Sequence, residues 1–164
     1  ASPIQSAILT DERKTGVTIM HIDEKLDHGP IVAQASIEPK PWPPKASELE
    51  EILAQEGGKL LAEVIPGWSE GSIASEPQDE LKATYSKKIS KEDGLIDLAG
   101  DPYENFRKIQ AFDLWPGAYF FVKRGGREVR VKITEATFED GRLVIARVVP
   151  EGKREMAYED FLRG

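Results

Sequence analysis

The chain has 164 residues, 40% of them apolar and 31% charged, and carries a net charge of −7 at pH 7. This is the composition of a globular protein with one domain or two small ones, and the lack of cysteine excludes a disulfide scaffold, a Cys-ligated zinc site and a thiol nucleophile. No apolar run approaches the roughly 20 residues of a membrane span, and the first residues do not resemble a secretory signal, so we expect a cytoplasmic protein with no membrane partner.

The first 37 residues predict a helix followed by two strands. Ser2, Pro3 and Gln5 are arranged as at a helix N-terminus, with a capping residue, a proline in the first turn and a capping-box glutamine. Residues 16–22 and 30–37 are rich in Val and Ile and favour strands. A polar turn joins them, so we expect the two strands to be neighbours.

A long helix is predicted next. A capping-box pattern begins at Ser47, and apolar residues then recur with helical spacing over 47–65. Gly57 and Gly58 lie inside this segment and favour a kink, because glycine costs about 1 kcal/mol relative to alanine in a helix. Residues 66–100 contain many Pro, Gly, Ser and charged residues and predict an irregular connection.

The last third is predicted to be a small antiparallel β unit with flanking helices. Asp101 and Pro102 begin a helix that extends to residue 112. Residues 118–149 alternate apolar and polar side chains and are interrupted by glycine turns, which indicates a meander of hairpins. A short strand-like segment and a helical turn over 158–163 close the chain.

Asp27 is the first candidate site residue. It lies in the sequence LDHGP between the two predicted strands, beside His28 and Gly29. Loops at strand ends often carry functional groups, and a carboxylate there can orient an imidazole or transfer a proton through water. The alternative is a turn aspartate that hydrogen-bonds its own backbone, and the local pattern favours this alternative.

The two histidines, His21 and His28, stand near Asp23 and Asp27. Such a group could ligate a metal, but its spacing matches no known ligand pattern. We therefore predict no metal site.

Residues 107–132 carry seven basic and two acidic side chains, interleaved with aromatic residues. Basic and aromatic side chains on a small β unit are suited to RNA, whose phosphates and bases they can contact. The alternative is that the aromatic residues are core and the basic residues form a solvated strand face. Alternation along the chain places most of these aromatic residues in the core.

Several motifs together resemble the methionyl-tRNA formyltransferase family. They are ASPIQSAIL, TGVTIMHIDEKLDHGPIVAQ, SELEEILAQEGGKLL, PQDELKATYSKKISKEDGLIDL and AFDLWPGAYFFV. Their order and spacing match the family from residue 1 to about residue 133, and the tail resembles the end of its C-terminal domain. TYSKKISKEDGLID is the most specific motif, whereas LDHGP is shared with other formyltransferases, including sugar N-formyltransferases.

The resemblance implies an α/β fold with a small β unit: the C-terminal part of a Rossmann-like formyltransferase domain, then a reduced OB-like antiparallel β domain. The implied division is 1–70 for the catalytic part, 71–100 for a linker and 101–164 for the OB-like domain. Only 13 residues separate VKIT from VVPEGK, where the family usually has several strands, so we expect an incomplete barrel.

The resemblance also implies formyl transfer from 10-formyltetrahydrofolate to the amino group of methionyl-initiator-tRNA, with no metal. It implies that Asp27 is a catalytic residue. The implied folate contacts are Ile22, Asp23, Glu24, Leu26, Asp27 and Gly29. The implied tRNA contacts are Arg124, Arg127, Arg130 and Lys132. The family's Asn and His, which share the chemistry with the Asp, belong to a segment that precedes the first residue here. We therefore expect the N-terminal half of the catalytic domain as a partner and no activity from this chain alone. The alternatives are part of a sugar N-formyltransferase and a tRNA-binding module without catalysis.

Overall fold

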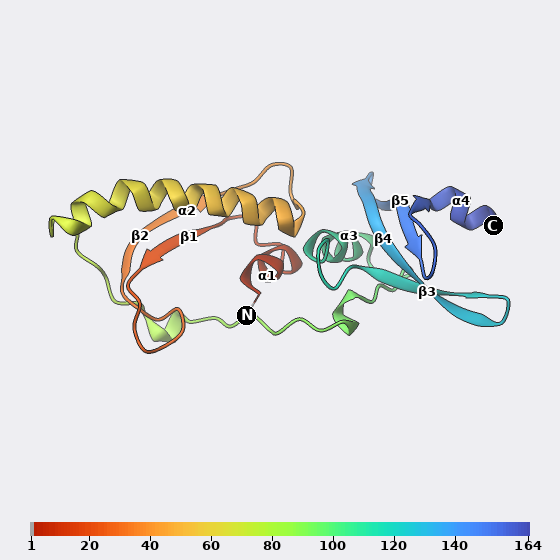
Figure 1. The fold of residues 1–164 in the computed structure, drawn as a ribbon, viewed down its shortest axis with the longest axis horizontal. Coiled ribbons are helices and arrows are strands. Elements are labelled where there is room, and N and C mark those ends of the chain that lie inside the picture. The colour runs from red at the N-terminus through yellow and green to blue at the C-terminus, as the bar shows by residue number, and fades with distance from the viewer. Residues whose placement is uncertain (1) are drawn as a thin grey trace.

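The computed structural model describes residues 2–164. It is elongated, with a small sheet toward each end and helix α3 between them (Figure 1). The helices are α1 (Pro3–Leu9), α2 (Ala46–Ser69), α3 (Pro102–Ala111) and α4 (Tyr158–Arg163), with 3₁₀ turns η1 (Glu80–Lys82) and η2 (Glu92–Gly94). The strands are β1 (Thr15–Met20), β2 (Ile31–Ile37), β3 (Tyr119–Arg124), β4 (Arg127–Glu139), β5 (Arg142–Pro150) and β6 (Met156–Ala157).

The first sheet is a hairpin of β1 and β2. The strands pair antiparallel, with Thr15 opposite Ile37 and Met20 opposite Ile31, which confirms the prediction of two adjacent strands. Helix α2 lies along this hairpin (Figure 1). The strand ends that carry Met20 and Ile31 are joined by the loop that contains Asp27.

Helix α2 is longer than predicted and begins differently. It starts at Ala46, and the N-cap is Lys45, whose backbone N–H donates to the Glu48 carboxylate over 3.1 Å. The predicted cap, Ser47, instead hydrogen-bonds Asp113. The helix is uninterrupted at Gly57 and Gly58, so the expected kink is absent, and it continues through Pro66 to Ser69. Among residues 2–164, no helix is both long and apolar enough to cross a membrane.

The second sheet has the order β3-β4-β5-β6, with every neighbouring pair antiparallel. This confirms the meander predicted over 118–149. The tight turns use positive φ angles at Gly125, Gly126 and Gly141, where glycine avoids the steric cost of a side chain. At the outer edge of β3, Leu95 forms a parallel bridge to Tyr119. The strands of the described residues thus form an open sheet rather than a closed barrel.

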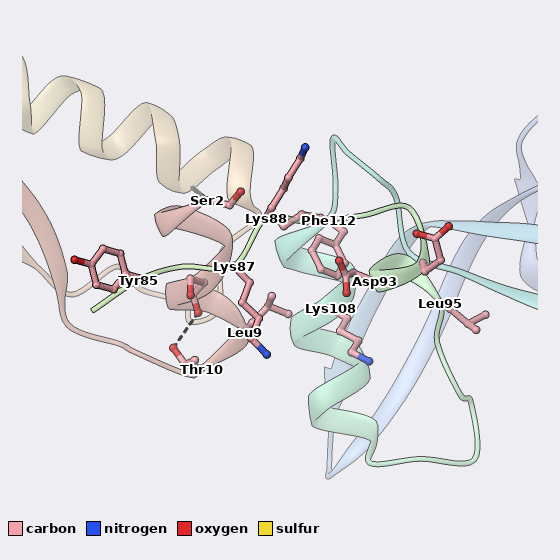
Figure 2. A pocket seen from close by; sticks show the side chains of 13 residues that line it. Ser2, Leu9, Thr10, Tyr85, Lys87, Lys88, Asp93, Leu95, Lys108 and Phe112 are labelled. Carbon is pink, nitrogen blue, oxygen red and sulfur yellow. Dashed lines mark hydrogen bonds between the residues drawn. The ribbon is translucent and has the colours of Figure 1, made fainter. Parts of the chain in front are cut away.

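One apolar cluster joins α1, α2 and α3. Its fully buried members are Ile8, Ala46, Leu49, Ala111 and Phe112. Figure 2 shows Phe112 on the side of α3 that faces α1. The end of α3 therefore belongs to the same core as the two helices that accompany the first sheet.

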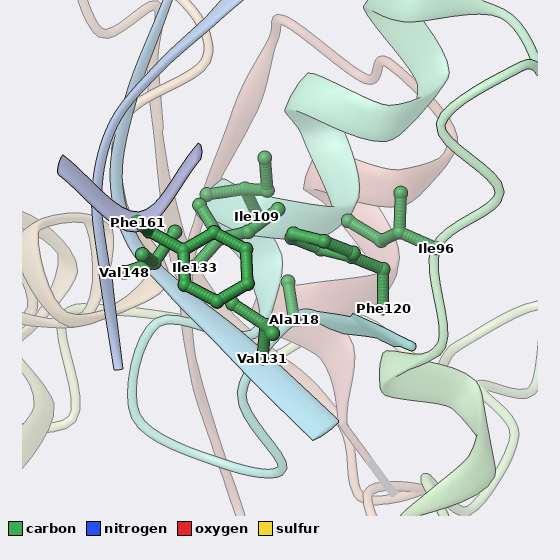
Figure 3. Packing of buried hydrophobic residues seen from close by; sticks show 8 residues of the cluster. All are labelled: Ile96, Ile109, Ala118, Phe120, Val131, Ile133, Val148 and Phe161. Carbon is green, nitrogen blue, oxygen red and sulfur yellow. The ribbon is translucent and has the colours of Figure 1, made fainter. Parts of the chain in front are cut away.

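A second cluster packs under the second sheet (Figure 3). Helix α3 contributes Ile109 to it, α4 contributes Phe161, and Ile96 comes from the segment before α3; the other members are Ala118, Phe120, Val131, Ile133 and Val148. Helix α3 is thus part of both cores. The division at residues 70 and 100 stays a prediction, and packing shows that its parts are not independent of each other.

Candidate functional site

The loop between β1 and β2 holds Asp27 with its backbone fixed and its side chain exposed. Gln78 donates from Nε2 to the carbonyl oxygens of Asp27, over 3.0 Å, and Gly29, over 2.8 Å. A Cβ on Gly29 would lie 1.8 Å from the carbonyl oxygen of His21, so only glycine fits there. Asp27 has φ +54°, a conformation that Asp tolerates better than most residues.

The Asp27 carboxylate accepts no hydrogen bond from residues 2–164. The loop itself is held by other groups, so the interpretation of Asp27 as a turn residue bonded to its own backbone finds no support here. A fixed loop with an exposed carboxylate is suited to act on a group outside the described residues.

His28 connects this loop to η1. Its Nδ1 lies 2.6 Å from Asp23 Oδ2, and its Nε2 lies 2.6 Å from Glu80 Oε1. Lys25 also reaches Glu80, with Nζ 3.1 Å from Oε1. The hydrogen bonds to Asp23 and then to Glu80 raise the pKa of His28. We refer to Asp23, Lys25, His28 and Glu80 as the loop cluster.

The loop cluster is stabilised in a charged state. The His28 hydrogen bond lowers the pKa of Asp23, and the Lys25 and His28 hydrogen bonds lower that of Glu80. Sequence analysis missed Glu80 because 52 residues separate it from His28, and no local pattern marks it.

The remaining residues of the predicted folate site differ in exposure and in their contacts. Ile22 is 95% exposed and Leu26 is 84% exposed, and Glu24 is also exposed. The Asp23 carboxylate is occupied by His28 and by the backbone N–H of Lys25, at 2.9 Å. The loop therefore presents two apolar side chains and the Asp27 carboxylate to its surroundings.

His21 makes different contacts from His28. Its Nε2 accepts a hydrogen bond from the indole N–H of Trp68 over 3.2 Å, and the two rings meet edge to face. Within residues 2–164, no three His, Asp or Glu side chains are grouped as ligands of a metal ion.

Two of the four predicted tRNA contacts lie on the outer face of the second sheet. Arg130 is paired with Phe121 and Lys132 with Tyr119, and cross-strand partners share a face. The Arg130 guanidinium carbon lies 3.8 Å from the centroid of the Tyr119 ring. Phe121 is 45% exposed. We refer to Tyr119, Phe121, Arg130 and Lys132 as the outer face.

The other two, Arg124 and Arg127, face each other across the tip of the β3–β4 hairpin on the opposite side of the sheet. Arg124 lies 4.1 Å from the centroid of the Phe161 ring and donates to the Phe161 carbonyl, so its guanidinium is used within the fold. Arg127 is exposed. The four cations therefore do not form a single patch.

Three of the five aromatic residues of the basic stretch are buried. Phe112, Tyr119 and Phe120 are buried, whereas Trp115 is 52% exposed. Phe112 and Phe120 belong to the two apolar clusters, and Tyr119 is buried on the outer face beside Arg130. Phe121 and Trp115 remain as exposed rings.

A cleft of about 590 Å³ lies between α1, α3 and the segment that precedes η2. Lys87, Lys88 and Lys108 line it together with Asp93 (Figure 2). None of its lining residues comes from the Asp27 loop. Lys87 and Lys88 belong to the TYSKKISKEDGLID motif, so this motif forms one wall of the cleft.

Two family profiles match the chain in sequence. Residues 1–65 match the family described as formyl transferase, and residues 88–142 match the formyl transferase C-terminal domain. The chain belongs to the formyltransferase family. The resemblance found from the motifs is thereby confirmed.

Curated formyltransferase relatives are similar over nearly the whole chain. The methionyl-tRNA formyltransferase of Chloroflexus aurantiacus is 38% identical over 90% of this chain, which covers 47% of the relative. That of Bacillus subtilis is 33% identical over 99% of this chain, which covers 58% of the relative. The chain thus spans about half the length of the curated relatives it matches.

Solved structures confirm the formyltransferase fold. HypX from Aquifex aeolicus, in complex with tetrahydrofolic acid, matches 99% of this chain with a TM-score of 0.74 at 20% identity, over 32% of its own length. A methionyl-tRNA formyltransferase from Clostridium thermocellum matches 92% of this chain with a TM-score of 0.67 at 20% identity, over 62% of its own length. The predicted α/β part followed by an antiparallel sheet is therefore correct.

Proposed function

We propose that the chain is one part of a methionyl-tRNA formyltransferase, which transfers the formyl group of 10-formyltetrahydrofolate to the amino group of methionine on initiator tRNA in the cytoplasm. The observation that carries this proposal is the 33–38% identity to methionyl-tRNA formyltransferases over at least 90% of the chain. This identity spans both sheets and the segment between them. Because the chain covers only about half of those relatives, the reaction requires the other half of the enzyme.

In this reaction the methionine amine attacks the formyl carbon, a new C–N bond forms, and the bond from the formyl carbon to the folate N10 breaks. The amine must lose a proton, and N10 must gain one. Asp27 is the group on this chain that serves this transfer, through the His that the family carries in its preceding segment. The exposed carboxylate of Asp27 and the hydrogen bonds from Gln78 to its loop support that role, because a proton-transfer group must be held in position and remain accessible.

The folate is expected to contact the Asp27 loop. The side chains of Ile22 and Leu26 are almost fully exposed on the same loop as Asp27, so their apolar surface is available to a bound molecule. We propose that they line one side of the folate site, with Glu24 and Gly29 beside them. Asp23 takes a structural part in the same loop through His28.

The outer face of the second sheet is the proposed tRNA contact. Arg130 and Lys132 supply charge for phosphates, and Phe121 supplies a ring on which a base can stack. Arg127 can reach the backbone from the hairpin tip, whereas Arg124 would first have to leave Phe161. We therefore assign the main contribution to Arg130 and Lys132.

The other half of the catalytic domain has a place to dock on this chain. A stripe of α2 with helical spacing holds Leu61, Ile65 and Trp68, which are 42%, 50% and 50% exposed. We propose that the remaining segment of the enzyme covers this stripe. The share of the curated relatives that lies outside this chain is large enough to supply such a segment.

The experiment that tests the proposal combines the 164-residue chain with the N-terminal half of the Chloroflexus aurantiacus relative. Formyl transfer from 10-formyltetrahydrofolate is then measured with two acceptors, methionyl-initiator-tRNA and a nucleotide-linked amino sugar. We expect formyl-methionyl-tRNA from the mixture and none from either half alone.

Each other outcome contradicts part of the proposal. Transfer to the amino sugar alone would show a sugar N-formyltransferase. Binding of tRNA by the chain without transfer by the mixture, in a mixture shown by gel filtration to contain the complex, would show a binding module without catalysis. Turnover by the chain alone would place the whole active site within these residues.

A further inference from the structure

The two ring nitrogens of His28 both face carboxylates. Asp23 lies on its own loop and Glu80 on η1, each with an oxygen 2.6 Å from a ring nitrogen. Ionised carboxylates can only accept hydrogen bonds. Both ring nitrogens must therefore carry a proton for both bonds to form, so the arrangement requires the imidazolium ion.

This arrangement connects two segments far apart in sequence. The loop that carries Asp27 is held to the segment of residues 78–80 by four side chains: Gln78 bonds backbone carbonyls of the loop, and Glu80 accepts from His28 and Lys25. Among these contacts, only that of His28 depends on a group that titrates near neutral pH.

We infer that protonated His28 is a positioning residue, which holds the Asp27 loop against η1 and releases it as the pH rises. The inference rests on the proposed function, since Asp27 is the group that it positions. When His28 loses a proton, one ring nitrogen faces a carboxylate without a hydrogen, so one of the two bonds is lost. The bonds from Gln78 and the Lys25–Glu80 ion pair remain, and the loop becomes looser on the side of His28 rather than unfolding.

The charged groups that face His28 determine the direction of this change. Asp23 and Lys25 face it from its own loop, and Glu80 faces it from η1. The two carboxylates outweigh Lys25, and the pKa of His28 is raised. The contribution of His28 is then fully present below about 6.5, the value of an unperturbed histidine, and is lost as the pH rises through the raised pKa of the folded protein.

The test uses the 164-residue chain and nuclear magnetic resonance. The first measurement follows the ring nitrogens of His28 against pH. The second follows hydrogen exchange at the amides of residues 22–29. The exchange rates are expressed as protection factors, so that the intrinsic pH dependence of exchange cancels. We expect the His28 midpoint to lie above 6.5, and loop protection to decrease over the same pH range in which His28 deprotonates.

Variants distinguish the effect of His28 protonation from a general loosening of the loop. Glu80→Gln is expected to shift the His28 midpoint toward 6.5, and His28→Gln to remove the pH dependence of loop protection. The matched control is His21→Gln, which removes the other histidine and keeps an acceptor for Trp68, and it is expected to preserve both effects.

A His28 midpoint at or below 6.5, or loop protection that is the same on both sides of the midpoint, would overturn the inference. In the reconstituted enzyme, His28→Gln is expected to lower kcat at pH values below the His28 midpoint of the wild-type protein. At pH values above that midpoint, kcat is expected to be unchanged. The resonance measurements need no catalysis, so their failure leaves the formyltransferase proposal intact, and a failed transfer assay leaves the measured loop behaviour intact.

Discussion

Replacement of Phe112 by alanine tests whether the two sheets are held together through α3. Phe112 is 2% exposed in the cluster that joins α1, α2 and α3. A buried phenylalanine removes about 200 Å² from water, which at about 25 cal/mol per Å² corresponds to about 5 kcal/mol as an upper bound. Measured Phe→Ala changes in cores cost about 3–5 kcal/mol, so we expect a loss of this size.

The free energy of unfolding is measured by urea denaturation with two probes. Circular dichroism reports the whole chain, and tryptophan fluorescence includes Trp42, which packs against the same cluster. Because a loss of several kcal/mol can unfold a marginal protein, Phe112→Leu serves as a milder variant, with an expected cost of less than about 1.5 kcal/mol. The control is Leu114→Ala, a nearby residue that is 65% exposed, with an expected change of about 0.5 kcal/mol or less.

A Phe112→Ala protein that loses no more stability than Leu114→Ala would contradict this expectation. That result would mean that Phe112 is not packed in solution as it is in this structure. The second sheet would then be free to move relative to the Asp27 loop, and tRNA bound on one could not be positioned by the other.

Three further predictions concern separate parts of the molecule. Gly58→Ala is expected to raise stability by about 1 kcal/mol in thermal or urea unfolding, since nothing lies within 4 Å of a Cβ at this position in α2; unchanged or lower stability would contradict this. In salt titrations of tRNA binding by the reconstituted enzyme, Arg130→Ser with Lys132→Ser should reduce the slope of log K against log salt by about 1.5, as expected for two phosphate contacts, whereas Lys59→Ser on α2 should not change it. Burial raises the pKa of Asp11, but hydrogen bonds from Trp42 and Tyr103 outweigh burial and lower this pKa below its ordinary value. Asp11 therefore contributes stability that is lost as the pH falls below about 4. Asp11→Asn should lower stability at pH 7 by about 1–2 kcal/mol and flatten the acid side of the stability profile, and an unchanged profile would refute the assignment.

Local patterns in the sequence predicted the elements well where the signal is itself local. Gly125-Gly126 marked the β3–β4 turn and Asp140-Gly141 the β4–β5 turn, and Asp101 caps α3 by accepting from the Glu104 N–H over 2.7 Å. Capping was predicted less well where a side chain found a distant partner. Ser2 makes no side-chain cap bond, and Ser47 bonds Asp113 instead of capping α2. A hydroxyl that can bond either its own helix or another element cannot be assigned from spacing alone.

The candidate site shows the same limit. Motif resemblance selected the loop with Asp27, but nothing in the sequence indicated that Gln78 and Glu80 hold that loop, since each lies about 50 residues away from its partner. Alternation predicted that most aromatic residues of the basic stretch are core, but it did not predict that the consecutive Tyr119 and Phe120 are both buried. Alternation within β4 also implies that Arg127 and Arg130 lie on opposite faces of the sheet, although the resemblance groups them in one tRNA contact. The place of Arg124, on the neighbouring strand, depends in addition on the register of the hairpin.

The central claim is that this chain supplies Asp27 to a formyl-transfer site completed by the other half of the enzyme. It is tested most directly by the single-turnover rate of formyl transfer to methionyl-initiator-tRNA in the reconstituted enzyme, with wild-type chain and with Asp27→Asn. A positioned proton-transfer group contributes about 10²–10⁴ in rate, so the variant should lose that factor, while Glu70→Gln, at the exposed end of α2, should retain the wild-type rate. An Asp27→Asn enzyme that assembles normally and transfers formyl groups at the wild-type rate would contradict the claim.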